Sequence, residues 1–275
     1  MSGENITIDF MIYGATNNPL RPLIGEIKAL AALGFDYLEL CLDPPHCVPE
    51  MLRPKLAEIR SVLDDEGLRL PVVHLPTFVW LADVYPSIRE ASVAEVFKTL
   101  DLAAQLGVKK AVLHPGYLTG MINFTLEIGK QYAAESLSRI LGKSAGLGIR
   151  VCLENMFPRA GHMYRPEEFA EVLDRNPGLM MTLDLGHANI RAPKNQAAAF
   201  VKIAHGRIGH VHIGDNSGQE DEHLPVGAGS VDVAGGLAVI KASGYDETMT
   251  LEVFSLERTY LSMSLKKVRA IWENA

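Results

Sequence analysis

The chain has 275 residues, of which 48% are hydrophobic and 21% are charged, so a wholly disordered protein is excluded. With 33 acidic and 26 basic residues, the formal net charge is −7, which gives no overall attraction to nucleic acid or anionic membranes. Three cysteines without a CxxC pair argue against a disulfide scaffold, so we expect a reducing, cytoplasmic location. The first residues lack a signal-peptide pattern, and no apolar run approaches the roughly 20 residues that span a bilayer.

Short β-rich runs alternate along the chain with longer stretches whose apolar residues recur every three or four positions, which is typical of half-buried helices. The runs predicted as strands are residues 6–14, 35–43, 68–76, 108–116, 149–155, 179–187, 207–216 and 246–254. Helical stretches between them include residues 22–34, 93–107 and 132–148. A glycine ends most helical stretches shortly before the next strand, as a left-handed helix terminus requires: Gly34, Gly67, Gly107, Gly148, Gly178, Gly206 and Gly244.

Eight βα units in roughly 250 residues describe a (β/α)8 TIM barrel of the α/β class. No Pro/Ser-rich linker or break in composition divides the chain, so we expect one domain over residues 1–275. A doubly wound open sheet is the alternative. It normally has a Gly-rich phosphate loop after the first strand, and the segment YGATNNP matches such a loop poorly.

Polar side chains gather at the carboxyl ends of the predicted strands and in the loops that follow, where barrel enzymes carry their chemistry. Carboxylates and imidazoles that converge on one mouth are ligands for a divalent metal, and an ion would relieve the repulsion among the carboxylates. His210 and His212 point the same way from one strand, and His212 is nearer the carboxyl end, so it is the favoured ligand. His210 is assigned to a deeper position or to substrate contact. The set is His74, His114, Glu154, Asp184, His187, His210, His212, Asp221, His223 and Glu252.

Other residues allow more than one interpretation each. Glu39 lies on the second predicted strand, either as a buried, partnered glutamate or as part of the barrel interior's chemistry. The apolar run 78–81, which contains Trp80, suits a sugar-facing wall, plain packing or a contact within a homo-oligomer. Arg191 and Lys194 follow the sixth strand, where they either meet a substrate phosphate or lie in a solvated loop.

These residues resemble the xylose-isomerase-like TIM-barrel superfamily, which includes sugar phosphate isomerases and epimerases and endonuclease IV (AP endonuclease family 2). The resemblance to endonuclease IV implies three zinc ions, and the D-x-H element in the strand-seven loop is its most specific part. Glu222 stands in the middle of that element where endonuclease IV has a basic residue, and a carboxylate there disfavours DNA. The implied ligands are His74, His114, Glu154, Asp184, His187, His212, Asp221, His223 and Glu252.

The resemblance to ketose 3-epimerases implies a single metal. Two epimerase features are missing, because the loop SGQEDEH has no arginine and the usual GEG turn is GAG at 227–229. The subgroup of sugar isomerase/epimerase-like proteins without an assigned substrate fits best. The four implied ligands lie within the endonuclease set: Glu154, Asp184, His212 and Glu252.

The leading hypothesis is a divalent-metal-dependent isomerase or epimerase of a small sugar, keto-sugar or sugar phosphate. It holds one to three ions of Zn, Mn, Mg or Co, and it works through an ene-diolate with Glu154 and Glu252 as the acid/base pair. The alternative is a multi-zinc phosphodiesterase of endonuclease IV type acting on abasic DNA. A third possibility is a sugar-binding protein that has lost catalysis.

Overall fold

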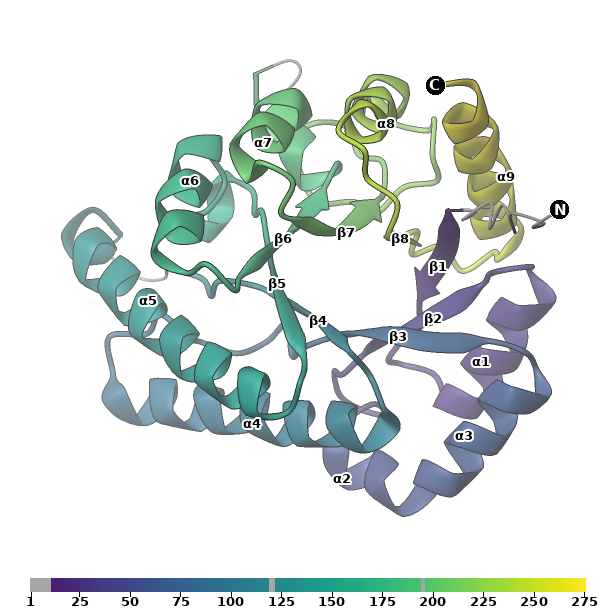
Figure 1. Ribbon diagram of the computed structural model, residues 1–275, viewed down its shortest axis with the longest axis horizontal. Helices are drawn as coiled ribbons and strands as arrows, with labels where there is room; N and C mark the ends of the chain where they lie inside the picture. Colours follow the sequence, from purple (N-terminus) through teal and green to yellow (C-terminus); the bar gives the residue numbers. More distant parts are fainter. Residues whose placement is uncertain (1–10, 119–121, 194–195) are drawn as a thin grey trace, which may run out of the picture.

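The computed structural model describes residues 11–118, 122–193 and 196–275, with the backbone alone for 122–124. Eight parallel strands follow one another in chain order round a closed barrel (Figure 1). The prediction of a single TIM barrel is thus confirmed for the fold. The strands are β1 Ile12–Thr16, β2 Tyr37–Cys41, β3 Arg69–His74, β4 Lys110–Leu113, β5 Arg150–Glu154, β6 Met180–Asp184, β7 Ile208–Ile213 and β8 Thr248–Leu251.

The first strand differs from its prediction. It was expected over residues 6–14, but β1 begins at Ile12 and extends to Thr16. Residues 6–10 lie outside the described part of the chain. The other seven predicted runs each contain the observed strand.

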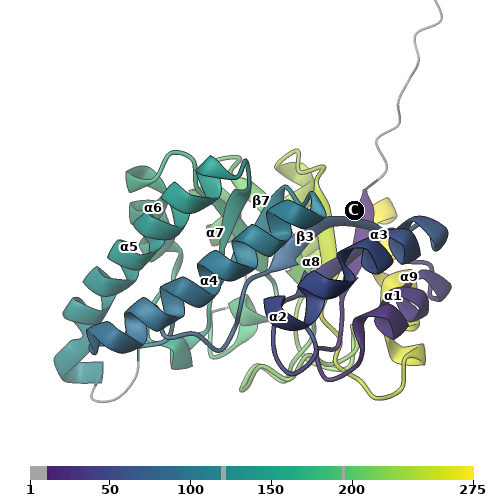
Figure 2. The ribbon, with the colours of Figure 1, turned by 90° about the horizontal axis from the view of Figure 1, so that it is seen from below.

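Helices surround the barrel, and the two longest, α4 and α5, lie side by side against one flank (Figure 2). Among the described residues, no helix combines the length and the apolar character needed to cross a membrane. The helices are α1 Leu23–Ala32, α2 Pro49–Leu52, α3 Leu56–Asp65, α4 Pro86–Leu106, α5 Ile122–Gly146, α6 Pro166–Arg175, α7 Gln196–Ala204, α8 Val233–Ala242 and α9 Thr259–Asn274.

The predicted glycine signal marks real helix ends. Helix α4 ends at Leu106, and its C-cap residue Gly107 has φ of 82°, a left-handed conformation that glycine adopts without steric strain. Helix α6 is the exception, because it ends at Arg175 and its cap is Asn176. Gly178 therefore does not close that helix.

Alternate residues of each strand face opposite sides of the barrel wall. Leu38 and Leu40 of β2 face outward and pack in the main core beneath the helices. Tyr37 and Glu39 of the same strand face the interior, where both are fully buried. Tyr37 fills space left by Gly14 of β1, where a Cβ would lie only 2.2 Å from the Tyr37 ring. The barrel interior therefore contains polar as well as apolar side chains, and the site described below lies at the carboxyl end of this interior.

A cavity of about 450 Å³ lies outside the barrel wall, between helices α5 and α6. Its floor includes Leu113 and Leu153, the outward-facing neighbours of residues at the barrel mouth. The titratable groups described below lie on the other side of that wall, so this cavity is separate from them.

Candidate metal centre

The carboxyl ends of the strands bring the predicted ligands to one mouth of the barrel. His74, Glu154 and Asp184 are the last residues of β3, β5 and β6, and the register pairs Asp184 with His212 of β7. His114 and Glu252 follow β4 and β8 directly. Most of the cluster is buried, with Glu154 and His212 at 0% exposure.

Glu154 lies at the centre of the cluster, with imidazoles on both of its oxygens. Its Oε2 lies 3.4 Å from Nε2 of His74 and 3.1 Å from Nε2 of His114. Its Oε1 lies 3.1 Å from Nδ1 of His212 and 3.3 Å from Nδ1 of His187. The Glu154 carboxylate therefore contacts both of the groups of candidate ligand atoms that are described next.

The first group joins four strands around one point. Nδ1 of His212 lies 3.8 Å from Oδ2 of Asp184 and 3.7 Å from Oε2 of Glu252. Ligand atoms of Glu154, Asp184, His212 and Glu252 all lie within 4.8 Å of one another, as do those of His74, His114 and Glu154. Three carboxylates with one imidazole are a donor set suited to a hard or borderline divalent ion.

Asp221 organises the remaining ligands. Its Oδ2 lies 3.2 Å from Nε2 of His187 and 3.1 Å from Nε2 of His223. Nδ1 of His223 in turn lies 3.7 Å from Oε2 of Glu252. The D-x-H element thus joins the rest of the cluster, and all nine residues predicted as ligands meet at this mouth.

The loop between β7 and α8 is folded back to reach the mouth. An isolated antiparallel bridge between Asp215 and Leu224 closes it, with backbone hydrogen bonds of 3.1 and 2.7 Å. His223, next to the bridge, has φ of 47°, an uncommon conformation for a residue with a Cβ. Glu222, the departure from the endonuclease pattern, is exposed and accepts the backbone N–H of Ser217 at 2.6 Å.

The electrostatics of the cluster favour a bound cation. Burial disfavours an ionised Glu154, but His212 and His114 beside it hold its pKa well below the usual range. Burial, aided by the nearby carboxylates of Glu154 and Glu252, raises the pKa of Asp184 to about 6. Burial opposes a charged His212, yet Glu252 foremost among its acidic neighbours raises its pKa well above the ordinary value. The carboxylates repel one another and draw protons to the histidines, a penalty that a bound cation removes.

Hydrogen bonds orient several of the imidazoles for ligation. Nδ1 of His74 donates to the Leu75 carbonyl at 2.8 Å, and Nδ1 of His187 donates to the Asn155 carbonyl at 2.8 Å. In both rings Nε2 is then left for the cluster. Among the described side chains, Nδ1 of His114 and Oε2 of Glu154 are buried without a hydrogen-bond partner. Orphaned atoms of this kind in a ring of N and O donors fit a divalent ion.

Of the four residues predicted to touch substrate, the three that the structure describes lie in different settings. Trp80 is 41% exposed and packs against Tyr117, with ring centroids 6.1 Å apart. Arg191 is exposed and bonds Glu220 at 3.2 Å. His210 is fully buried one layer below the mouth, and both of its ring nitrogens are hydrogen-bonded. The structure therefore does not place it among the candidate ligands at the mouth. Lys194 lies outside the described residues.

Three residues near the cluster were not predicted from the sequence. Tyr117 follows His114, at a centroid distance of 6.4 Å, and burial raises its pKa to about 12. The Asn155 side chain clamps the backbone of Asp184 through two hydrogen bonds, of 2.8 and 2.9 Å. The Asp215 carboxylate accepts backbone N–H groups of residues 216, 227, 229 and 231. Asn155 directly follows β5, and Tyr117 and Asp215 lie in the loops after β4 and β7, so position after a strand was the available signal.

Comparisons with known proteins agree with this geometry. An uncharacterized protein of Methanocaldococcus jannaschii, MJ1311, is 30% identical over 255 residues, covering 88% of this chain and 83% of that protein. L-ribulose 3-epimerase of Mesorhizobium japonicum is 25% identical over 250 residues, covering 88% and 78%. A shorter match, 27% identical over 123 residues and covering 44% and 41%, is a probable endonuclease 4 of Acholeplasma laidlawii.

Among solved structures, a D-tagatose 3-epimerase-like protein superposes with a TM-score of 0.81 and 25% identity, covering 96% of this chain and 99% of that one. The family model described as xylose isomerase-like TIM barrel matches residues 27–270. The closed barrel and the family match lead to one assignment: the chain belongs to the xylose isomerase-like TIM-barrel family.

Proposed function

We propose that this protein is a divalent-metal-dependent isomerase or epimerase acting on a small sugar, keto-sugar or sugar phosphate. The observation that carries the proposal is the four-residue group Glu154, Asp184, His212 and Glu252, whose ligand atoms lie within 4.8 Å of one another. The similarity of the chain to sugar 3-epimerases over most of its length supports the same class of reaction.

In this proposal the two glutamates move the proton. A divalent ion bound by the four side chains would polarise a carbonyl oxygen and the adjacent hydroxyl and stabilise an ene-diolate. Glu154 comes from β5 and Glu252 follows β8, and oxygens of both lie near Nδ1 of His212, at 3.1 and 3.7 Å. One glutamate removes the proton from the hydroxyl-bearing carbon next to the carbonyl, and the other returns a proton to that carbon, on the opposite face for epimerisation.

The surrounding side chains suit a sugar. Trp80 and Tyr117 form an aromatic edge beside His114, and Phe254 packs against His223 with ring centroids 4.4 Å apart. Aromatic walls with a few convergent polar groups are typical of small-molecule sites. The exposed Trp80 indole is the part of this edge available to a sugar's apolar face.

A second candidate is a multi-zinc phosphodiesterase acting on abasic DNA. The observation that favours it is the pair of extra ligand groups, His74 with His114 and Asp221 with His187 and His223, which a one-ion site does not require. The probable endonuclease 4 relative is compatible with it. Against it stand the net charge of −7 and the exposed Glu222 carboxylate.

The test begins with the number of metal ions per chain, measured by mass spectrometry on protein purified without chelators. The loaded protein is then assayed on a panel of ketoses, aldoses and their phosphates, and on a duplex with one abasic site. One labile ion with exchange of a sugar C–H proton supports the proposal. About three zinc ions with salt-sensitive cleavage of the duplex would replace it by the second candidate. Sugar binding without turnover would instead indicate a binding protein.

A further inference from the structure

Below the mouth, the barrel interior contains a buried carboxylate at the centre of a hydrogen-bond network. Glu39 of β2 is fully buried. Its Oε1 accepts from Nε2 of His212 at 3.0 Å, and its Oε2 accepts from Nε2 of His210 at 2.7 Å and from the Thr250 hydroxyl at 2.5 Å. Glu39 thus touches His212 on the side opposite the metal centre.

The chemistry of the groups fixes the direction of the hydrogen bonds that reach His210. The Lys110 ammonium can only donate, so it donates to Oγ1 of Thr248 at 2.8 Å. The Thr248 hydroxyl then donates to Nδ1 of His210 at 2.7 Å. His210 therefore carries its hydrogen on Nε2 and donates it to Glu39.

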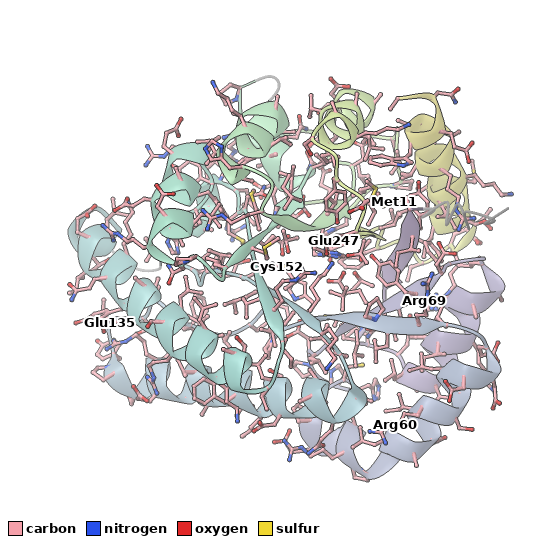
Figure 3. All side chains as sticks on the ribbon, in the orientation of Figure 1. Met11, Arg60, Arg69, Glu135, Cys152 and Glu247 are labelled. Carbon is pink, nitrogen blue, oxygen red and sulfur yellow. The ribbon has the colours of Figure 1, made fainter. Side chains whose placement is uncertain are left out.

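A second branch of the network also ends on Glu39. The Thr250 hydroxyl uses its hydrogen toward Glu39, so the Tyr37 hydroxyl, 2.8 Å away, donates to Oγ1 of Thr250. At the amino end of the barrel, Lys110 is balanced by Glu247, whose carboxylate lies 2.7 Å from Nζ. Figure 3 labels Glu247 near the middle of the barrel. Both branches of the network thus end on Glu39, which is left as an ionised acceptor inside the barrel.

This polarity has a consequence for His212. A carboxylate that accepts from three donors leaves the hydrogen of the neutral His212 ring on Nε2. Nδ1, which faces oxygens of Glu154, Asp184 and Glu252, then has a free lone pair. We propose that Glu39 is a positioning residue that fixes the tautomer of His212, so that Nδ1 is presented to a divalent ion at the candidate metal centre. The inference rests on the metal site of the proposed function but not on its reaction.

The isosteric variant Glu39→Gln tests this inference. A carboxamide has one acceptor oxygen and one NH2 group, whereas three donors converge on Glu39. In either orientation, therefore, its NH2 group faces at least one donor. With the amide nitrogen toward His212, only the opposite tautomer satisfies the contact, and its hydrogen on Nδ1 blocks ligation. We expect the affinity for Zn²⁺ at this centre to fall about 10- to 100-fold, the usual cost of losing such an outer partner.

The matched control is Thr250→Val, which removes another donor to Glu39 and disturbs the same interior but leaves the contact between Glu39 and His212. Zn²⁺ affinity is measured by competition with a chromophoric chelator for the wild type and both variants. We expect Thr250→Val to lose thermal stability yet bind Zn²⁺ within about threefold of the wild type. Equal affinity of Glu39→Gln and the wild type, or an equal loss in both variants, would overturn the inference.

A measurement on the wild type keeps the inference testable should Glu39→Gln not fold. Long-range ¹H–¹⁵N spectra of the histidine side chains report which ring nitrogen carries hydrogen. In the Zn²⁺-loaded protein we expect His212 to carry it on Nε2, and hydrogen on Nδ1 would overturn the inference. Neither readout uses turnover, so a wild type that binds Zn²⁺ but converts no sugar would refute the proposed function alone.

Discussion

Glu154 is the residue on which the candidate metal centre depends most. Its two oxygens face different histidines, and removing its charge leaves those histidines without their shared acidic partner. Glu252 has a smaller set of contacts, with Oε1 accepting from the Thr16 hydroxyl at 3.2 Å and Oε2 facing His212. Thr16 therefore holds one oxygen of Glu252 and leaves the other for the cluster.

From this arrangement we expect Glu154→Gln and Glu252→Gln each to lower turnover of the sugar substrate by roughly 10²- to 10⁴-fold, the contribution of a positioned acid or base. Glu222→Gln is the control, because this exposed carboxylate contacts its own loop and not the cluster. Circular dichroism verifies that each variant is folded. Near-normal rates in either of the first two variants would remove the acid/base assignment.

Gly14 sets the shape of the barrel interior through its lack of a side chain. A Cβ there would lie 2.2 to 2.5 Å from three atoms of the Tyr37 ring, which is fully buried and has nowhere to move. Gly14→Ala is therefore expected to lower the free energy of unfolding by about 1–3 kcal/mol. Gly25→Ala in the exposed part of α1, where a Cβ meets nothing within 4 Å, should raise it by up to about 1 kcal/mol. Urea denaturation of both variants measures the difference, and equal effects would contradict the argument.

At the scale of elements, the order of the strands and the convergence of the candidate ligands could be predicted because a parallel barrel places the end of every strand at one mouth. The start of β1 could not, since residues 6–14 form a continuous β-rich run and pairing with β2 and β8 decides where the strand lies. The contact partners of residues in the barrel interior could not be predicted from the sequence either. Glu39 and His210 are 171 positions apart, and only barrel closure and register bring them together.

The β7–α8 loop depends on a single buried carboxylate. Asp215 accepts four backbone N–H groups, an arrangement that an amide with one acceptor oxygen cannot reproduce. We expect Asp215→Asn to cost about 1–3 kcal/mol of stability and to lower occupancy of the part of the metal centre formed by Asp221 and His223.

The control for this loop is Asp232→Asn at the start of α8. Asp232 caps the helix by accepting from Gly235 N, and asparagine caps a helix about as well. Metal content per chain and hydrogen exchange of residues 217–224 are the measurements. Unchanged exchange and full metal content in Asp215→Asn would show that the loop holds its shape without this carboxylate.

For the molecule as a whole, the closed barrel combines two environments in one wall. Outward-facing residues such as Leu40 and Leu153 pack beneath the helices, while inward-facing Glu39 and Glu154 belong to a continuous polar network. His212 connects the two carboxylates, with Nε2 toward Glu39 and Nδ1 toward Glu154. Metal binding at the mouth is thereby linked to the stability of the barrel interior.

This link predicts opposite pH trends for the metal-free and metal-loaded protein. Burial alone would lower the pKa of His74, but Glu154, followed by Glu252 and Glu39, raises it to about 9. A folded-state pKa above the unfolded value of about 6.5 contributes stability that is complete below pH 6.5 and is lost as the pH rises through 9. The metal-free protein should therefore become less stable between pH 6.5 and 9. Over the same interval metal affinity should rise, because the ligand is neutral imidazole.

Differential scanning calorimetry at pH 6, 7.5 and 9, with and without an equimolar divalent ion, measures both trends. The stabilisation by the ion should grow with pH, since it follows the ratio of ion concentration to Kd. His74→Gln, which removes the titrating group but keeps a polar side chain, should flatten the decline of the metal-free protein. A metal-free Tm that is independent of pH in the wild type would mean that the Glu154 carboxylate does not raise the pKa of His74 in the folded protein. An ion-induced shift that shrinks with pH would contradict ligation by neutral histidines.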